Sequence, residues 1–224
     1  MVEGPLLLEF HAIPAYITYT WLAMAILIGL AILVRISLSK TAPTGIQNIF
    51  EAIIGGLEKY MVENMGPEGR PFLPLVGTLF LFILVCNLLG LIPGFESPTA
   101  NWNTTLPLAV IVFLVTHAVG IGKWGAKYIK HFFGPLWGAA VLMFPIEIIS
   151  HLARVITLSV RLFGNMIAKH ILLIVLFIIF PYLLQVPILG LGFLVAFVQA
   201  GVFALLTIMY IAGSLEASHL GAEH

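Results

Sequence analysis

Three charged residues stand seven positions apart in the mostly apolar stretch 147–170: Glu147, Arg154 and Arg161. Two turns of an α-helix take about 7.2 residues, so on a helix these side chains lie almost one above another. Ser150, Thr157 and Asn165 widen the same stripe. Charged groups at membrane depth cost about 3 kcal/mol or more and normally face protein or water. We predict an apolar helix with one polar stripe. The alternative is a loop with its charges at the lipid headgroups, although no turn signal interrupts the stretch.

Arg161 has the chemistry of a fixed positive charge. A guanidinium keeps its proton, because its pKa lies above about 12, and so it cannot relay protons. It can attract a carboxylate and hold it ionised, since an opposite charge within about 4 to 6 Å lowers a carboxyl pKa by roughly 1 to 3 units. The alternative is a salt bridge within the chain, to Glu147 or Glu216. For Arg154 that alternative is as well supported as a functional role.

Several motifs match one family in their order along the chain. RLFGNM begins at Arg161, NLLGLIP begins at Asn87, and TANWNTT begins at Thr99. The last apolar stretch contains Gln199 followed by TIMY, which ends at Tyr210. Together these motifs resemble bacterial subunit a of the F-type ATP synthase, the membrane stator of a rotary proton motor, over nearly the whole chain.

The resemblance implies a role for the polar positions. Arg161 would be essential and would face a rotor carboxylate, which releases its proton before meeting Arg161 and takes up another afterwards. Two offset aqueous half-channels would lead to that carboxylate. The candidate ion-path residues are Asn87, Glu147, His151, Asn165, His170 and Gln199, with Arg154, Glu96 and Glu216 as secondary candidates. For each of the neutral ones, a hydrogen-bonded clamp between helices is the alternative.

The resemblance also implies the partners and the shape. The partners would be a ring of rotor c-type subunits, peripheral-stalk b-type subunits and, indirectly, the ATP synthase head. The last two helices would form a long tilted hairpin along the ring. The chain has no P-loop pattern, so we expect a non-catalytic membrane subunit without nucleotide, metal or other cofactor.

The sequence departs from the family pattern at three positions. His170 stands where many members have Glu, Gly192 replaces a titratable residue seven positions before Gln199, and Gly90 replaces an Asp found in some members. The outer half-channel would then depend on His170, Glu96 or water. Histidine can relay protons near neutrality, since its ordinary pKa is about 6.5. His117, near the inner end of its helix, is expected to be structural or interfacial.

The composition is that of a membrane protein. The chain has 224 residues, of which 61% are hydrophobic and 9% charged, and its mean hydropathy is +1.11. Soluble domains carry about 25% charged residues. The net charge of zero excludes a nucleic-acid footprint. A single cysteine, Cys86, excludes an intrachain disulfide and suggests a buried apolar role. The amino-terminal residues lack the basic region of a signal peptide.

The apolar runs predict an all-α polytopic membrane protein with about five membrane helices. The predicted spans are 12–34, 71–95, 105–122, a long helix from near Leu136 towards Phe180, and 188–214, with turns at 96–104 and at 181–187. Residues 44–64 predict an amphipathic helix on the membrane surface, with an ordinary loop helix as the equal alternative. We predict one domain, 1–224, divided into 1–43, 44–70, 71–130, 131–215 with the ion path, and a cytoplasmic tail, 216–224.

The basic residues predict the orientation. All of those in the connections fall on one side: Arg35, Lys40, Lys59, Arg70, Lys123, Lys127 and Lys130. That side is expected to be cytoplasmic, which places the N-terminus outside and the C-terminus inside a bacterial plasma membrane.

Three other functions remain as alternatives. A secondary transporter would show repeated halves and broken helices, neither of which is clear here. A b-type haem anchor would need axial histidines on facing helices, for which His117, His151 and His170 are available. A passive scaffold has no need of a buried arginine stripe.

Overall fold

The computed structural model describes residues 14–36, 45–92, 95–125, 140–179 and 185–216, and every regular element in these ranges is helical. The α-helices are α1 (Ala15–Ile36), α2 (Gly45–Met65), α3 (Leu73–Leu89), α4 (Trp102–Trp124), α6 (Ala140–Ile179) and α7 (Gln185–Glu216). Two 3₁₀ helices, η1 (Gly66–Phe72) and η2 (Pro98–Ala100), precede α3 and α4. The predicted all-helical class is therefore confirmed.

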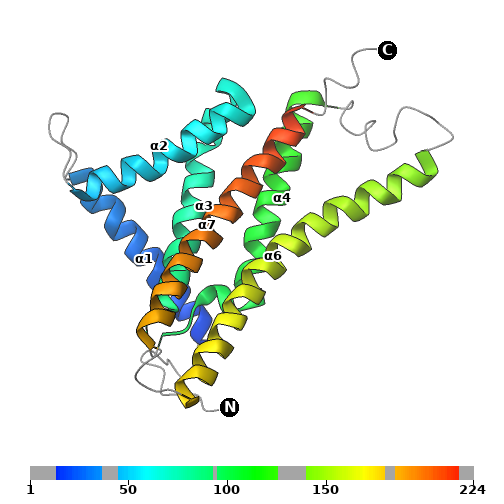
Figure 1. The fold of residues 1–224 in the computed structure, drawn as a ribbon. Helices are drawn as coiled ribbons and strands as arrows, with labels where there is room; N and C mark the ends of the chain where they lie inside the picture. Colours follow the sequence, from blue (N-terminus) through cyan, green and yellow to red (C-terminus); the bar gives the residue numbers. More distant parts are fainter. Residues whose placement is uncertain (1–13, 37–44, 93–94, 126–139, 180–184, 217–224) are drawn as a thin grey trace.

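Helices α3, α4 and α7 stand side by side at the centre (Figure 1). Helix α1 packs against α3 on one side, and α6 packs against both α4 and α7 on the other. The centre is filled by large apolar side chains that include Phe80, Ile83, Leu162, Phe203 and Ile208, each at most 3% exposed. The outward faces carry exposed Ile, Leu and Val, as expected where lipid replaces water as the solvent.

Four stretches of the described residues are long and apolar enough to cross a membrane: Ala15–Ile36, Gln47–Leu89, Trp102–Lys123 and Leu189–Leu215. Helix α6 adds a fifth long helix that carries the charged stripe. The described residues therefore contain four to five long apolar helices, which agrees with the predicted polytopic membrane protein.

Helix boundaries differ from the predicted ones where local chemistry decides them. Helix α4 begins at Trp102 rather than 105, because the Asn101 side chain accepts a hydrogen bond from the Asn103 N–H (2.9 Å) and caps the helix. Helix α7 already includes Pro187, which the sequence analysis wrongly assigned to the turn. Proline fits the first turn of a helix, where its missing N–H would have no partner. Residues 136–139 and 180–184 lie outside the described ranges.

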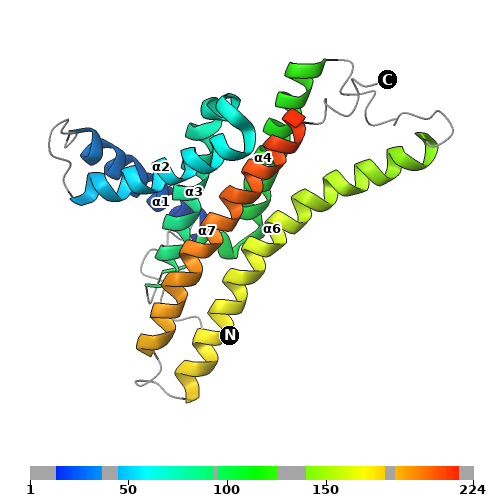
Figure 2. The same ribbon diagram turned by 45° about the horizontal axis from the view of Figure 1, so that its top comes forward.

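Helix α2 runs across the ends of α3 and α7 instead of beside them (Figures 1 and 2). Leu57 and Met61 are buried against the core, as the predicted apolar face requires. Ile49 is 61% exposed, whereas Gln47 is buried and donates to Glu51 (2.7 Å). The apolar side chains of α2 therefore pack against the core from Ile53 onward. Its position on a membrane surface stays a prediction.

Two ion pairs gather at the end of the molecule that holds η1. Arg70 contacts Glu58 of α2 (3.2 Å), and Lys123 at the end of α4 contacts Glu68 of η1. The basic residues Lys123 of α4 and Arg70 of η1 therefore lie at one end, and the orientation of that end in the membrane stays a prediction.

Helix α6 is the longest element. Its 40 residues correspond to about 60 Å at 1.5 Å per residue, about twice the hydrocarbon thickness of a bilayer. Its C-terminal half lies along α7, whereas its N-terminal half diverges from α7 (Figures 1 and 2). Such a helix must cross a membrane obliquely or extend beyond it.

Candidate functional site

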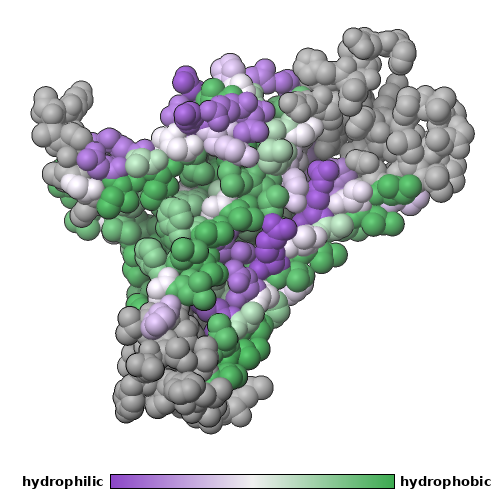
Figure 3. Space-filling model, in the orientation of Figure 1, coloured by the Kyte–Doolittle hydropathy of each residue, from purple (hydrophilic) through white to green (hydrophobic). Residues whose placement is uncertain are grey.

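One polar stripe runs along α6 on the side nearest α7. Arg154, Thr157, Arg161 and Asn165 follow one another at helical spacing, and the first three are exposed. In the space-filling view, hydrophilic residues form a diagonal band between α7 and α6, with apolar surface on both sides (Figure 3). The polar side chains from Arg154 to Asn165 thus form one continuous polar strip on the surface of α6.

Arg161 points away from the packed side of α6. Leu158, Leu162 and Met166, on other faces of the helix, are at most 2% exposed, whereas Arg161 is exposed. No described residue forms an ion pair or a hydrogen bond with its guanidinium. Because an exposed charge between apolar surfaces is costly in a membrane, this side chain is suited to a charged or aqueous partner outside the described structure.

Two contacts to α4 hold the back of α6 on either side of Arg161. The Ser159 hydroxyl donates to the Thr105 hydroxyl (3.1 Å), and both residues are fully buried. The Phe163 ring packs edge-on against Trp102, with centroids 5.4 Å apart. Residues two before and two after Arg161 lie roughly opposite it on the helix, so these contacts fix the direction in which Arg161 points.

Asn165 and Gln199 form the first contact between the stripe and α7. The Asn165 amide donates to the Gln199 side-chain carbonyl (3.1 Å), and Gln199 is only 7% exposed. The described hydrogen bond of Gln199 is to Asn165, one turn beyond Arg161. Four residues take Asn165 about 6 Å along the helix from Arg161, so the two share one environment.

Arg154 and Tyr210 form a second contact between the same helices. The Arg154 guanidinium carbon lies 5.2 Å from the centre of the Tyr210 ring, within the range of a cation–π interaction. Eleven residues separate Arg154 from Asn165 on α6, and eleven separate Gln199 from Tyr210 on α7. The two helices are therefore antiparallel in a constant register, and Arg161 lies between the contacts. Among the described residues no carboxylate pairs with Arg154, but the side chains of Glu147 and Glu216, the partners considered for a salt bridge, lie outside the described part, so that salt bridge stays a prediction.

Asn87 joins four segments at the other end of the site. Its amide donates to the Ala196 carbonyl of α7 (3.4 Å), and its side-chain oxygen accepts from Thr99 (2.7 Å). Its backbone carbonyl accepts from Lys169 of α6 (3.4 Å). Asn87 is fully buried. These contacts correspond to the clamp between helices that the sequence analysis considered as the alternative for this residue.

Lys169 is a site residue that the sequence analysis did not select. It is 7% exposed although it carries an amino group, and Asn87 provides its described hydrogen bond. A β-carbon on Gly192 would come within 3.6 Å of the Lys169 side chain and within 2.5 Å of Leu91. Glycine at 192 therefore leaves room for both side chains. The sequence did contain a signal for this residue: a lysine within an apolar stretch, eight residues past Arg161. Charged residues inside a membrane mark functional positions.

The remaining candidates are placed as follows. His151 is half-buried on α6, with its ring centre 4.7 Å from that of His117 on α4. Glu96 is half-buried in the connection before η2. Glu147 and His170 lie within α6 and Glu216 ends α7, but their side chains are outside the described part of the structure. Among the described residues, no group of three or more His, Cys, Asp or Glu could hold a metal ion.

The comparisons with known proteins agree on one family. The model of the family described as ATP synthase A chain matches residues 17–212. The chain is 54% identical over 203 residues to ATP synthase subunit a of Geotalea uraniireducens (strain Rf4), and 52% identical over 203 residues to that of Geobacter sulfurreducens. Both alignments cover 91% of this chain and 88% of the relative. With ATP synthase subunit a 1 of Syntrophotalea carbinolica it shares 49% identity over 212 residues, 95% of this chain and 90% of the relative. The chain, a multi-pass membrane protein with an arginine stripe on its longest helix, therefore belongs to the ATP synthase A chain family.

Proposed function

We propose that the chain translocates protons through the membrane sector of an F-type ATP synthase and couples their flow to rotation of a ring of c-type subunits. Arg161 is the fixed charge that meets each ring carboxylate. Two half-channels, one from each side of the membrane, deliver protons to that carboxylate and remove them. The chain has no catalytic role of its own and binds no nucleotide. Residues 1–224 form one membrane domain.

The observation that carries the proposal is the exposed guanidinium of Arg161 between apolar surfaces. An arginine facing lipid would cost about 3 kcal/mol or more, so it requires a partner on the outer face of α6. A carboxylate on a passing ring subunit is such a partner. The contacts of Ser159 and Phe163 to α4 support this role, because they keep Arg161 pointing towards that partner.

The half-channels are assigned from the remaining polar residues. Asn165 and Gln199 lie next to Arg161 and line the path at the level of the ring carboxylate. Asn87, His170 and Glu96 serve the outer half-channel, and Glu147 and His151 serve the inner one. Because Asn87 is fully buried and already holds Thr99, its part is to shape the outer half-channel rather than to titrate.

The partners and the orientation complete the proposal. The ring of c-type subunits lies against the α6–α7 stripe, and peripheral-stalk b-type subunits hold the chain still against the ATP synthase head. The end that carries Arg70 and Lys123 faces the cytoplasm of a bacterium, following the distribution of basic residues. The N-terminus is then outside and the C-terminus inside.

Substitution of Arg161 tests the proposal. Arg161→Ala in the assembled complex should abolish ion-driven ATP synthesis in membrane vesicles while the chain and the ring still copurify. Arg161→Lys should also fail or nearly fail, because a compact ammonium lacks the planar fork of a guanidinium and loses its proton more readily when buried. Thr157→Val, one turn earlier on the exposed stripe, is the matched control and should retain synthesis. Near-normal synthesis with Arg161→Ala would refute the proposal.

A further inference from the structure

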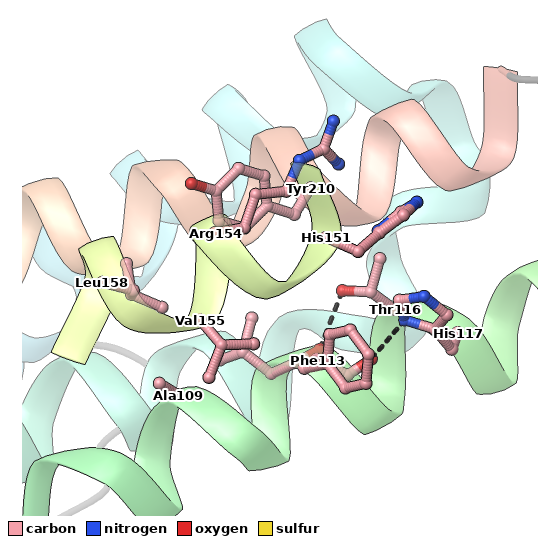
Figure 4. Close-up of a pocket in the computed structure, with 10 residues that line it drawn as sticks. Ala109, Phe113, Thr116, His117, His151, Arg154, Val155, Leu158 and Tyr210 are labelled. Carbon is pink, nitrogen blue, oxygen red and sulfur yellow. Dashed lines mark hydrogen bonds between the residues drawn. The ribbon is translucent and has the colours of Figure 1, made fainter. Parts of the chain in front are cut away.

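A small cavity lies between α4, α6 and α7, beside Arg154 (Figure 4). Its volume is about 20 Å³. Its polar lining comes from three helices: Thr116 and His117 of α4, His151 and Arg154 of α6, and Tyr210 of α7. A site of about 10–15 Å³ that offers two or more polar partners is sufficient for one water molecule. The cavity therefore has the size and the lining of a water site.

The two histidines of the cavity meet directly. Their ring centres are 4.7 Å apart, with the planes at 68°. The Nδ1 atom of His117 lies 2.9 Å from the Phe113 carbonyl oxygen. A carbonyl oxygen can only accept, so Nδ1 carries the proton and donates, which leaves Nε2 as the nitrogen that takes up and releases protons. Histidine is the side chain that ordinarily exchanges protons between about pH 5 and 8.

A permanent positive charge lies beside the pair. Arg154 lines the same cavity and is held near the Tyr210 ring, 5.2 Å from its centre. The other lining residues, which include Val112, Val155 and Leu158, are apolar. The polar side chains of the cavity therefore form a small group enclosed by apolar ones.

The cavity lies between Arg161 and the charged end of the molecule. His151 precedes Arg161 by ten residues, or about 15 Å along α6. His117 precedes Lys123 by six residues, or about 9 Å along α4. Lys123 contacts Glu68 at the charged end of the molecule. The cavity thus lies between the arginine that faces the ring and the charged end.

We propose that His117 and His151, with water in the cavity that they line, form a proton-exchange pair at the inner mouth of the ion path. This inference rests on the proposed function. A proton released by a ring carboxylic acid reaches one imidazole through water, forms an imidazolium, and leaves from the pair to water at the inner face. Both rings return to the neutral form, so no other reactant is consumed. His117 is thereby a further residue of the path.

The test uses vesicles that contain the complete complex, stripped of its soluble head, and measures passive proton flux under an imposed potential between pH 5.5 and 8.5. We expect His117→Gln and His151→Gln each to slow the flux several-fold and to change its dependence on pH, because glutamine cannot take up and release a proton as histidine does. The double variant should be no slower than the slower single variant, because both act in one unit. His117→Ala should regain flux on addition of free imidazole, a rescue that a merely structural role would not give. His219→Gln, in the C-terminal tail, is the control and should match the parent.

The outcomes separate this inference from the function on which it rests. Loss of ion-driven ATP synthesis in Arg161→Ala, together with an unchanged flux–pH curve in both His→Gln variants, would overturn the histidine pair and leave the proposed function standing. Near-normal ATP synthesis in Arg161→Ala would overturn the proposed function, and the pair with it. Slower flux in both His→Gln variants, with imidazole rescue, would support the pair.

Discussion

The hydrogen bond between Asn165 and Gln199 predicts an unusual order of stabilities. Gln199 is 7% exposed, whereas Asn165 is half-buried. Asn165→Leu removes the described partner of a buried amide, and leaving a buried polar group unsatisfied costs about 1–3 kcal/mol. Gln199→Met removes the partner of the Asn165 amide, but Asn165 is half-buried and water can reach it. The free energy of unfolding of this variant should therefore fall by about 1 kcal/mol or less.

The double variant should be more stable than Asn165→Leu alone. With both amides replaced by apolar groups of similar shape, no buried polar group remains, and such pairs of changes are often nearly neutral. The coupling free energy should be about 1 kcal/mol, between the average of about 0.6 and the maximum of about 1.7 kcal/mol for hydrogen bonds between membrane helices. A coupling of this size changes the folding equilibrium about fivefold.

The assay is unfolding of the purified chain in mixed micelles by increasing SDS, followed by circular dichroism, for the parent, both single variants and the double variant. Thr157→Val combined with Gln199→Met is the matched control and should be additive, because the described hydrogen bond of the Thr157 hydroxyl is to Ala153 of its own helix (2.6 Å). Additive effects of Asn165→Leu and Gln199→Met would refute the reasoning.

The parent, the two single variants and the double variant also show whether Asn165 and Gln199 act as a clamp between helices or as a lining of the ion path. If Asn165 and Gln199 serve only as a clamp, proton-driven ATP synthesis in vesicles should recover in the double variant along with its stability. If their amides line the path, synthesis should stay low although stability returns. The proposed function predicts the second result.

Three further predictions follow from the site. Cysteines at Lys127 and Ser218 should label from the cytoplasmic side, and one at the exposed Asn103 should label from outside; labelling of positions 103 and 127 from one side would contradict the orientation. His170→Ala and His170→Leu should slow proton flux several-fold between pH 6 and 9 while His170→Glu retains much of it, and equal flux in all three would remove His170 from the path. Tyr210→Leu should cost about 0.5–1 kcal/mol in SDS unfolding through the lost contact with Arg154, and little further loss should follow when Arg154→Gln is added.

The local pattern of the chain predicted the helices and the stripe well. Apolar runs bounded by Pro, Gly and charge gave α1, α4 and α7 to within about three residues at each end, because a membrane helix satisfies its own backbone hydrogen bonds and depends little on distant contacts. The seven-residue spacing of Arg154 and Arg161 gave the stripe for the same reason. The relation between these residues is encoded within one helix. The predicted span 71–95 was too long at its end, because α3 stops at Leu89 and the chain turns at Gly90.

Contacts between helices could not be predicted in this way. Lys169 lies about 80° round α6 from Arg161, off the stripe, and its hydrogen-bond partner is 82 residues away on α3. Thr99 was expected in a polar loop, but it is buried because Asn87 accepts its hydroxyl hydrogen. His117 and His151 come from different helices, so periodicity along either one says nothing about their meeting.

The constant register between α6 and α7 limits how this segment can change over evolution. Asn165 contacts Gln199 and Arg154 lies over Tyr210, with eleven residues, or about three turns, between the contacts on each helix. Deleting one residue between Gln199 and Tyr210 would rotate the rest of α7 by about 100° and shift it by about 1.5 Å relative to α6. The helices could then keep either the Asn165–Gln199 contact or the Arg154–Tyr210 contact, but not both. Substitutions can accumulate here one at a time, whereas insertions and deletions cannot. Differences in length among related chains should therefore be confined to the connections, and the 199–210 segment should keep one length wherever the two contacts are kept.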